Sequence, residues 1–325
     1  MKIAFGLMVA ALAVAQDSAS HFAAAKAAAG ADWDRFLEFQ CNGPGPRVPT
    51  AATAAAPAAA PAGGRGQGQG RGPAGPPDRS TWYAEPGKVF DNLYFFGQSE
   101  YSVWAITTSQ GIIVMDTIFD YSVEEEVVNG MKKMGLDPST IKYAIVSHPH
   151  PDHDGGARYL QDHFGTRVIM SPADWDVIDR RTNGTKPKRD IEATNGQKLT
   201  LGDTTVTMYI LPGHTPGTIS SVFQVKDNGT THTVALWGGA GIHQDKTSVN
   251  QYIQASKSFA EIVKGVNADI ILANHTDWDH SKVNVPALAK RAPGTPNPYV
   301  VGNAKVLSFL KVAEECATAR VPYAN

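Results

Sequence analysis

The sequence has little excess charge of either sign. It contains 29 lysine and arginine residues against 31 aspartate and glutamate residues, which gives a formal net charge of -2 over 325 residues. A balance of this kind provides no extended basic surface for a nucleic acid and argues against a nuclease. A convincing serine or cysteine nucleophile partnered with a base is also missing. The sequence therefore favours a small-molecule substrate and a reaction that requires no protein nucleophile.

Cysteine is nearly absent, and Cys41 and Cys316 are the only two. In an exported chain, an even number of cysteines can pair in a disulfide. Here a disulfide would join the N-terminal helical segment to the C-terminal helix. Two unpaired thiols are the alternative, and the sequence leaves both open.

Long apolar runs are confined to the start of the chain. Met1 and Lys2 precede an apolar run over residues 3–12, and Ala13-Val14-Ala15 follows as a cleavage site of small residues. This pattern predicts a signal peptide over residues 1–15, because the run is too short to span a bilayer. The expected location is periplasmic or secreted, without a membrane anchor after cleavage. The alternative is a buried N-terminal helix.

Composition divides the rest of the chain into three parts. Residues 16–41 contain two helix-forming stretches, the second with an apolar face. Residues 42–80 consist almost entirely of alanine, proline and glycine with scattered arginine and glutamine, which cannot bury a core, so a flexible linker is expected. Residues 81–325 alternate predicted strands and helices in two comparable halves. This order predicts an α/β layered sandwich rather than a barrel or a bundle.

The expected elements of the folded part follow apolar periodicity and turn residues. The predicted strands are 88–96, 101–107, 111–116, 141–146, 167–170, 197–201, 204–211, 220–225, 231–237 and 268–272. The predicted helices are 122–134, a segment opening at Gly155-Gly156, 172–179 and 251–266, and residues 297–319 are expected to form a short strand and a C-terminal helix. Residues 238–250 are expected to be a loop.

The densest chemical signal is the run from Ser147 to Gly156, Ser-His-Pro-His-Pro-Asp-His-Asp-Gly-Gly. Three histidines and an aspartate within it, His148, His150, Asp152 and His153, could all bind metal. The run lies between a predicted strand and a predicted helix, where functional loops are often found. His148 and His150, two residues apart, point the same way in an extended stretch, and Asp152 and His153 can turn toward a second position.

Two further histidines stand downstream at predicted strand ends, His214 and His275. Zinc in a catalytic site takes three protein ligands and leaves room for water. The sequence therefore offers His148, His150 and His214 for one ion. It offers Asp152, His153 and His275 for a second ion, with His280 as a rival to His275.

The unbroken H-x-H-x-D-H motif at 148–153, the Gly-His-Thr-Pro-Gly run at 213–217 and His275 resemble the ligand motifs of the metallo-β-lactamase superfamily. The resemblance covers roughly residues 82–278 and implies an αβ/βα sandwich of two mixed sheets flanked by helices, with a two-zinc site at one edge. Relatives that hydrolyse lactones, thioesters or tRNA have a bridging aspartate after the strand at 234–237, and the first lactamase subclass has a cysteine there. This sequence has Gly238-Gly239-Ala240-Gly241 instead, which is similar to the third lactamase subclass.

The resemblance implies an exported zinc-dependent hydrolase of β-lactams, in which a hydroxide held by two zinc ions attacks the ring carbonyl and Asp152 orients it. Two alternatives remain open: a hydrolase of the same fold acting on lactones, esters or sulfate esters, and a zinc-binding protein without turnover. Four residues are placed to approach the metals: Gln244, Lys246, Ser248 and Trp278. Asp245 is a candidate ligand only if its loop folds back. The oligomeric state is left open.

Overall fold

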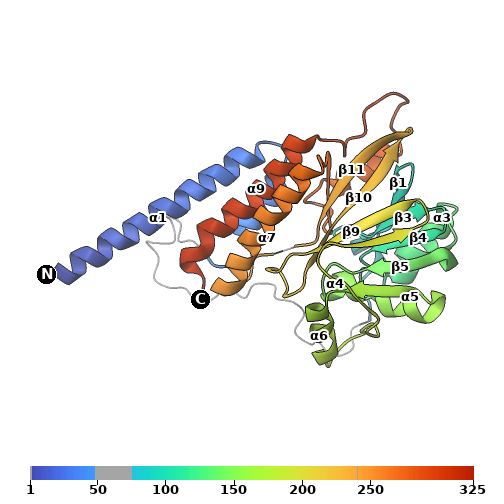
Figure 1. Ribbon diagram of the computed structural model, residues 1–325, viewed down its shortest axis with the longest axis horizontal. Helices are drawn as coiled ribbons and strands as arrows, with labels where there is room; N and C mark the ends of the chain where they lie inside the picture. Colours follow the sequence, from blue (N-terminus) through green and yellow to red (C-terminus); the bar gives the residue numbers. More distant parts are fainter. Residues whose placement is uncertain (1, 48–74, 240) are drawn as a thin grey trace.

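A computed structural model of the chain describes residues 2–47, 75–239 and 241–325. Two sheets form its centre, and helices cover the outer face of each (Figure 1). Most of the predicted linker, residues 48–74, lies outside the described residues. The described end of that segment forms the short 3-10 helix η1 (Arg79–Thr81), which Asp78 caps by accepting a hydrogen bond from the backbone N–H of Ser80.

The first sheet has seven strands that lie in sequence order. The first four strands pair antiparallel, and the pairs from the fourth to the seventh are parallel. The strands are β1 (Gly87–Phe90), β2 (Leu93–Phe95), β3 (Trp104–Thr108), β4 (Gly111–Met115), β5 (Ile141–Ile145), β6 (Arg167–Met170) and β7 (Ile191–Glu192).

The second sheet has five strands in the order β12-β11-β10-β9-β8. Only the pair of β11 and β12 is parallel, so this sheet is mixed as well. The strands are β8 (Gln197–Leu201), β9 (Thr204–Ile210), β10 (Ile219–Asp227), β11 (Thr230–Trp237) and β12 (Ile270–Ala273).

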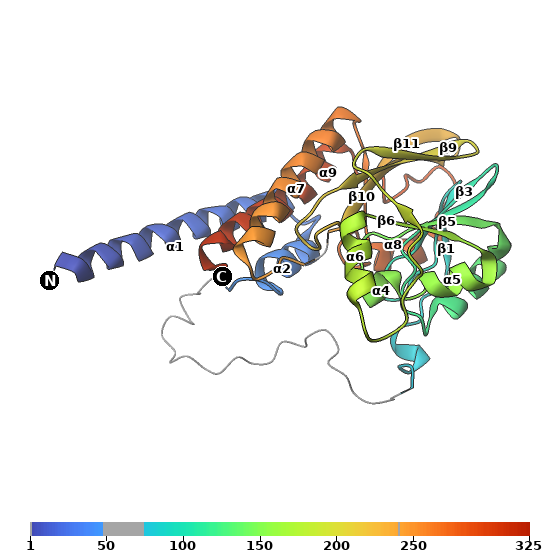
Figure 2. The ribbon, with the colours of Figure 1, turned by 60° about the horizontal axis from the view of Figure 1, so that its bottom comes forward.

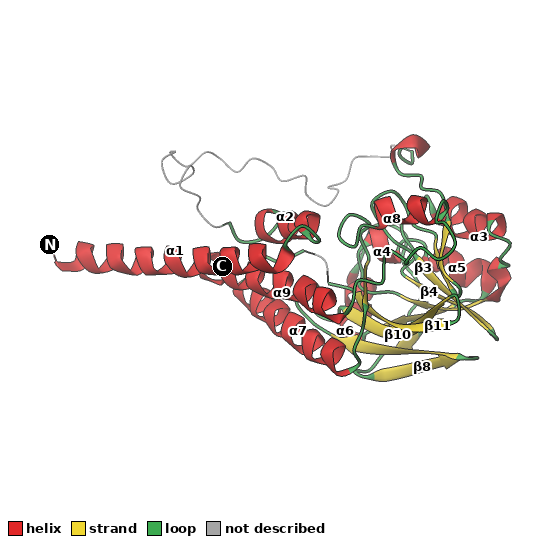
Figure 3. Ribbon diagram, turned by 90° about the horizontal axis from the view of Figure 1, so that it is seen from above, coloured by secondary structure: helices red, strands yellow, loops and turns green. Residues whose placement is uncertain are grey.

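Helices fill the two outer layers, as the view from above shows (Figure 3). Those on or near the first sheet are the π-helix η2 (Glu124–Asn129), α3 (Gly130–Lys133), η3 (Pro138–Thr140), α4 (Pro151–Asp154), α5 (Ala157–Phe164), α6 (Pro172–Arg180) and α8 (Ser281–Leu288). Those on the side of the second sheet are α1 (Lys2–Ala29), α2 (Asp34–Asn42), α7 (Lys246–Gly265), α9 (Asn303–Arg320) and η4 (Val321–Tyr323). Among the described residues, no helix is both long enough and apolar enough to cross a bilayer.

Apolar side chains alternate along the strands and so build the layers. In β4, Ile113 and Met115 join the core between the sheets, whereas Ile112 and Val114 face the helices on the outer side. This period of two places one set of side chains on each face of a strand. A third core packs the second sheet against α7 and α9, with Phe259 and Phe309 fully buried in it. The predicted αβ/βα sandwich of two mixed sheets is confirmed.

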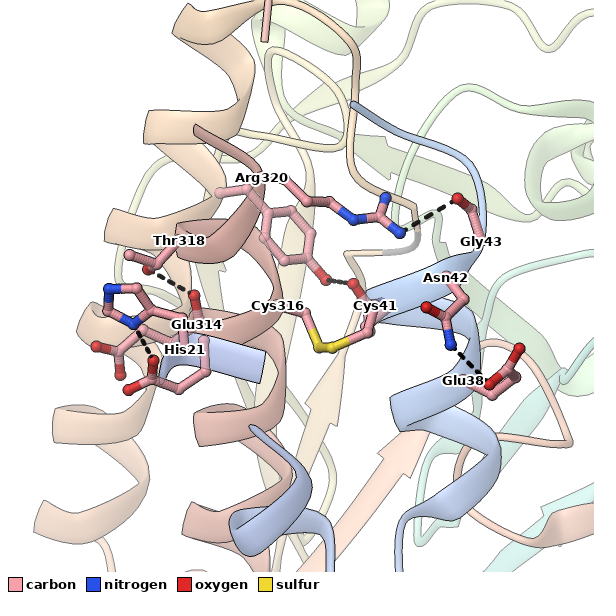
Figure 4. Close-up of a disulfide and its surroundings, with 12 residues drawn as sticks. His21, Glu38, Cys41, Asn42, Gly43, Glu314, Cys316, Thr318 and Arg320 are labelled. Carbon is pink, nitrogen blue, oxygen red and sulfur yellow. Dashed lines mark hydrogen bonds and ion pairs between the residues drawn. A yellow bond between two sulfur atoms is a disulfide. The ribbon is translucent and has the colours of Figure 1, made fainter. Parts of the chain in front are cut away.

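The N-terminal helices belong to this third core. α9 lies against α1, α2 and α7 (Figure 2), and Trp33 and Phe36 are buried among its side chains. Cys41 and Cys316 form a disulfide with their Cα atoms 4.8 Å apart (Figure 4). The structure therefore has the first of the two cysteine alternatives, the link between the N-terminal segment and the C-terminal helix.

Several predicted boundaries were wrong for local reasons. Residues 88–96 form two strands, because the chain turns at Asp91-Asn92 and Phe90 pairs with Leu93. Residues 297–302 form no strand. The backbone N–H groups of Val301 and Gly302 instead both donate to the carbonyl oxygen of Asp269.

Two helices also differ from the prediction. α7 begins at Lys246, inside the segment expected to be a loop, because the Asp245 side chain accepts a hydrogen bond from the backbone N–H of Ser248 and caps it. α8 was not predicted, and Pro286 lies inside it.

Candidate metal centre

The histidine-rich loop follows β5 in the first sheet. His148 comes three residues after the end of β5, and His150 has an extended backbone as the N-cap of α4. Pro151 occupies the first turn of α4, where its missing N–H costs no hydrogen bond. Asp152 and His153 therefore lie on a short helical turn rather than on the irregular loop expected, and this turn directs them to a second position.

The second sheet supplies the remaining two histidines. His214 lies on the connection from β9 to β10, and His275 follows β12 by two residues. Backbone pairing ties both segments to the first half, since Ile219 N–H donates to Ser147 O at 2.8 Å and Tyr101 forms an isolated bridge with His275. The site is thus built between the two halves.

His148, His150 and His214 form the first group. The Nε2 atom of His214 lies 3.2 Å from Nε2 of His148 and 3.1 Å from Nδ1 of His150. His148 is fully buried and His214 is 9% exposed. Two nitrogens bound to one zinc at about 2.1 Å with tetrahedral angles lie about 3.4 Å apart, so the group has nearly the spacing that zinc requires.

Asp152, His153 and His275 form the second group. Oδ2 of Asp152 lies 3.2 Å from Nε2 of His153 and 3.9 Å from Nε2 of His275. The His153 Nε2 atom is buried and has no hydrogen-bond partner despite this proximity. A buried nitrogen of this kind is costly unless something binds it, and a metal ion would do so. In each group, the three ligand atoms lie within 4.8 Å of one another.

Asp116 orients the histidine loop from the end of the neighbouring strand β4. It follows β4, and its carboxylate accepts hydrogen bonds from Ser147 N–H at 2.6 Å and from Ser147 Oγ at 2.9 Å. The same carboxylate lies 2.9 Å from Nδ1 of His153. Its backbone has a φ of 62°, an uncommon conformation for a residue other than glycine. Occupying Nδ1 in this way leaves Nε2 of His153 facing the site, as in many metal centres.

His148 and His214 are oriented in the same manner. Nδ1 of His148 lies 3.0 Å from Ser147 Oγ, and Nδ1 of His214 lies 2.8 Å from the carbonyl oxygen of Gly241. Both therefore direct Nε2 into the site. The sequence prediction missed Asp116, although β4 and β5 are parallel neighbours whose ends meet at one edge of the sheet.

Asp174 supports the loop that carries His214. Its carboxylate accepts hydrogen bonds from Thr215 Oγ1 at 2.7 Å and from Gly217 N–H at 2.9 Å. Burial raises the pKa of Asp174 to about 7, although these hydrogen bonds oppose the shift. A Cβ atom at Gly217 would lie 1.7 Å from Ser171 Oγ, so this position has room only for glycine.

The environment keeps several of the histidines neutral. Burial lowers the pKa of His150 to about 4 and that of His275 to about 3, and neighbouring histidines add to the effect. The pKa values of His148 and His214 are also lowered, first by burial. Neutral imidazole is the form that binds metal. For His153, burial is outweighed by Asp152 and Asp116, which raise its pKa to about 10.

The structure also places the remaining candidates. Trp278 stacks on His275 with ring centroids 4.0 Å apart. His280 stacks on Trp33 and contacts the carbonyl oxygen of Asp32, away from both groups. Asp245 caps α7, and Lys246 and Ser248 lie in the first turn of that helix. Gln244 pairs through its backbone oxygen with Asn325.

Comparison with known proteins agrees with this geometry. Residues 97–228 match the family model described as the metallo-beta-lactamase superfamily. A hydroxyacylglutathione hydrolase of Xanthomonas axonopodis pv. citri is 27% identical over 113 residues, which are 35% of this chain and 38% of the relative. An N-acyl homoserine lactonase of a Bacillus species is 29% identical over 110 residues, which are 33% of this chain and 42% of the relative. The chain thus spans less than half the length of these curated relatives.

The solved structures agree over a longer part of the chain. BJP-1, a subclass B3 metallo-beta-lactamase of Bradyrhizobium japonicum, aligns with a TM-score of 0.59 and 24% identity. The alignment covers 71% of this chain and 91% of BJP-1. Residues 97–228 therefore match the metallo-beta-lactamase superfamily, and the chain has the metallo-beta-lactamase fold.

Proposed function

We propose that this protein is a metal-dependent hydrolase that opens β-lactam rings with the help of two zinc ions. One observation carries the proposal: two groups of three ligand atoms lie side by side, with the rings of His148 and His153 only 4.2 Å apart. Structural zinc is normally enclosed by four protein ligands, whereas catalytic zinc keeps one position open. Each group of three has the composition of a catalytic site.

The residues divide by role. His148, His150 and His214 would hold the first ion, and Asp152, His153 and His275 the second. Such ions, when bound, polarise a carbonyl and lower the pKa of water enough to provide a nucleophile near neutral pH. Asp152 has a further role as a positioning carboxylate, because an oxygen not used for binding can accept a hydrogen bond from the attacking water. Asp116 would hold the loop that carries His148, His150 and His153 in place, and Asp174 would hold the loop that carries His214.

The end of β11 favours a β-lactam over other substrates. Gly238 follows this strand, and a Cβ atom there would lie 1.9 Å from the carbonyl oxygen of Ile219. A side chain therefore does not fit at Gly238. The bridging aspartate of lactonases, thioesterases and tRNA-processing relatives has no counterpart among the residues described at this strand end. In this respect the chain is similar to the third lactamase subclass.

A second candidate function is the hydrolysis of lactones or thioesters. The names of the two curated relatives favour it, since one is a hydroxyacylglutathione hydrolase and the other an N-acyl homoserine lactonase. The same donor set would serve this chemistry, because a lactone carbonyl and a lactam carbonyl are polarised alike. The missing aspartate makes this candidate second.

We also propose that the protein is exported, with residues 1–15 removed as a signal peptide. The disulfide supports this proposal, because disulfides persist in oxidising compartments such as the periplasm. Sequencing the N-terminus of protein purified from the periplasm tests it, with Gln16 as the expected first residue.

A substrate panel tests the proposed activity. The zinc-loaded protein is assayed with benzylpenicillin, nitrocefin, imipenem, an N-acyl homoserine lactone and S-lactoylglutathione. We expect hydrolysis of the three β-lactams, and its loss in His148→Ala. His163→Ala is a matched control, because His163 is exposed and stacks on Tyr159. Turnover of the lactone or thioester alone would select the second candidate, and zinc binding without any turnover would reject both.

A further inference from the structure

A continuous row of aromatic rings borders the second ligand group. Tyr101 lies 5.1 Å from His275, measured between ring centroids, and Phe119 lies 5.3 Å from Tyr101. On the other side, Trp278 stacks on His275, and Phe39 lies 4.6 Å from Trp278 and 6.5 Å from His275. Tyr101, Phe119 and Phe39 are only partly buried, so they present apolar surface beside the site.

Phe39 belongs to α2, far from the other rings in sequence and outside the segment that matches the family model. Its ring also approaches the loop that orients His214, because a Cβ atom at Gly241 would lie 3.7 Å from it. The carbonyl oxygen of Gly241 lies 2.8 Å from Nδ1 of His214 and can only accept a hydrogen bond from it. Phe39 thus lies beside residues that contact both ligand groups.

Several contacts fix α2 in this position. A helix of nine residues is marginal by itself, so its place depends on what it packs against. Cys41 is joined to Cys316, and Arg320 donates a hydrogen bond to the carbonyl oxygen of Gly43 at 3.2 Å (Figure 4). Arg320 also donates to the carbonyl oxygen of Pro44 at 2.7 Å. Phe36 stacks on Phe309 with centroids 3.8 Å apart.

Further contacts hold the same helix along its length. Tyr252 donates a hydrogen bond to Oε1 of Gln40 at 3.2 Å, and Trp33 donates to Oγ of Ser308 at 2.9 Å. Trp33 also stacks on His280. Because these contacts already fix α2, the helix would lose little conformational freedom when a ligand binds to it, which favours binding.

We propose that α2 forms one wall of the substrate-binding site and that Phe39 is a specificity-determining residue that binds an apolar, preferably aromatic, side group of the substrate. The inference rests on the proposed hydrolase function, since the substrate is assumed to bind at the two ligand groups. A substrate ring placed against the partly exposed Phe39, beside His275, would gain contacts that a small substituent cannot make. Substrates with bulky apolar side groups should therefore bind best.

The binding of two thiols tests whether Phe39 contacts an aromatic group of the ligand, and this test requires no turnover. Mercaptoacetic acid and 2-mercapto-3-phenylpropionic acid share a thiolate and a carboxylate, and they differ by a benzyl group. Thiolates are good zinc ligands, so both should bind the zinc-loaded protein. We expect the benzyl compound to bind about tenfold more tightly, as measured by calorimetry, because aromatic contacts add to the burial of its surface.

Three variants locate the origin of this preference. Phe39→Ala should abolish it and Phe39→Leu should retain part of it, while mercaptoacetic acid binds all variants alike. Phe22→Ala is the matched control, because Phe22 is a partly buried phenylalanine of the same N-terminal segment that packs in the α9 core. Circular dichroism confirms that each variant is folded.

The outcomes separate this inference from the proposed function. A benzyl preference that survives in Phe39→Ala, or that is absent from the unaltered protein, would reject the proposal that Phe39 binds an aromatic group of the ligand. Loss of the preference in Phe39→Ala but not in Phe22→Ala supports it, whichever substrates of the panel are hydrolysed. If β-lactams are also hydrolysed, the KM for benzylpenicillin should rise in Phe39→Ala while kcat changes little.

Discussion

At the scale of single residues, Asp116 matters most for the metal centre, although it is not among the proposed ligands. Its carboxylate accepts two hydrogen bonds from Ser147 and lies within hydrogen-bond distance of Nδ1 of His153. Replacing it by asparagine keeps the size but removes the charge and one acceptor. Because outer partners of this kind orient the ligands, we expect zinc affinity in Asp116→Asn to fall about 10-fold to 100-fold. Competition with a chromogenic chelator measures the change.

Asp227→Asn is a suitable control for this variant. Asp227 is a partly shielded carboxylate in an ion pair with Arg291, and it lies at the β10–β11 hairpin, outside both ligand groups. Equal zinc affinity in Asp116→Asn and the unaltered protein would show that Asp116 does not orient His153.

The buried carboxyl group of Glu126 predicts how the stability of the fold depends on pH. This residue of η2 is 1% exposed, and burial raises its pKa to about 8 while a hydrogen bond from Ala84 N–H opposes the shift. The folded state therefore binds the proton more tightly than the unfolded state, whose value is near 4.5. The contribution of Glu126 to stability is full below about pH 4.5 and falls as pH rises toward 8.

Glu126→Gln should remove this part of the pH dependence. Thermal melting at pH 5 should be similar for both proteins, while at pH 8 the variant should be more stable by roughly 2–4 kcal/mol, because each pKa unit corresponds to about 1.4 kcal/mol. Buried Asp154, Asp174 and Asp279 also have raised pKa values, so only the difference between variant and unaltered protein isolates Glu126. Parallel stability curves for the two proteins would contradict the assignment.

At the scale of elements, the disulfide between α2 and α9 is a covalent restraint on the N-terminal segment. It closes a loop of 275 residues, and a cross-link that spans a long loop restricts the unfolded chain. The double variant Cys41→Ser/Cys316→Ser should lose about 2–4 kcal/mol of stability. Melting followed by circular dichroism measures the loss.

Reductant provides the control for the double variant. It should lower the melting temperature of the unaltered protein to that of the double variant and leave the variant itself unchanged. An equal melting temperature for the oxidised protein and the double variant would mean that packing alone holds α2.

The elements show what the sequence could and could not predict. The histidine loop was predictable because its donors are close in sequence, and most strands were predictable because their apolar residues alternate or run together. Asp116 and Asp174 were not, since a single aspartate after a strand or in a helix has no distinctive spacing. The approach of Phe39 to Trp278 was also missed, because the contact depends on how α2 packs on α9. His280 is the opposite case: the sequence made it a candidate ligand, but the fold directs its ring to Trp33 instead.

At the scale of the whole molecule, the candidate site joins two sheets that otherwise meet through their apolar core. The first sheet supplies His148 and Asp152, and the second supplies His214 and His275. Metal bound there would link the two halves and stabilise only the folded state. Removing it with a chelator should lower stability by about 4 kcal/mol for each ion held at a thousand times its dissociation constant.

Calorimetric melting before and after dialysis against a chelator measures this effect, with re-addition of zinc as the control. We expect zinc to restore the original transition. A transition that does not respond to metal would mean that the six donors form a rigid cluster without a bound ion.

We propose that these six residues form a two-zinc hydrolytic site for β-lactams. The most direct measurement is the initial rate of nitrocefin hydrolysis by protein with a known metal content, from none to two zinc ions per chain. We predict no turnover without metal and a rate that rises with zinc and reaches its maximum at two ions. A fully metallated protein that leaves nitrocefin, penicillins and carbapenems intact would show that the six residues do not form a β-lactam-hydrolysing site.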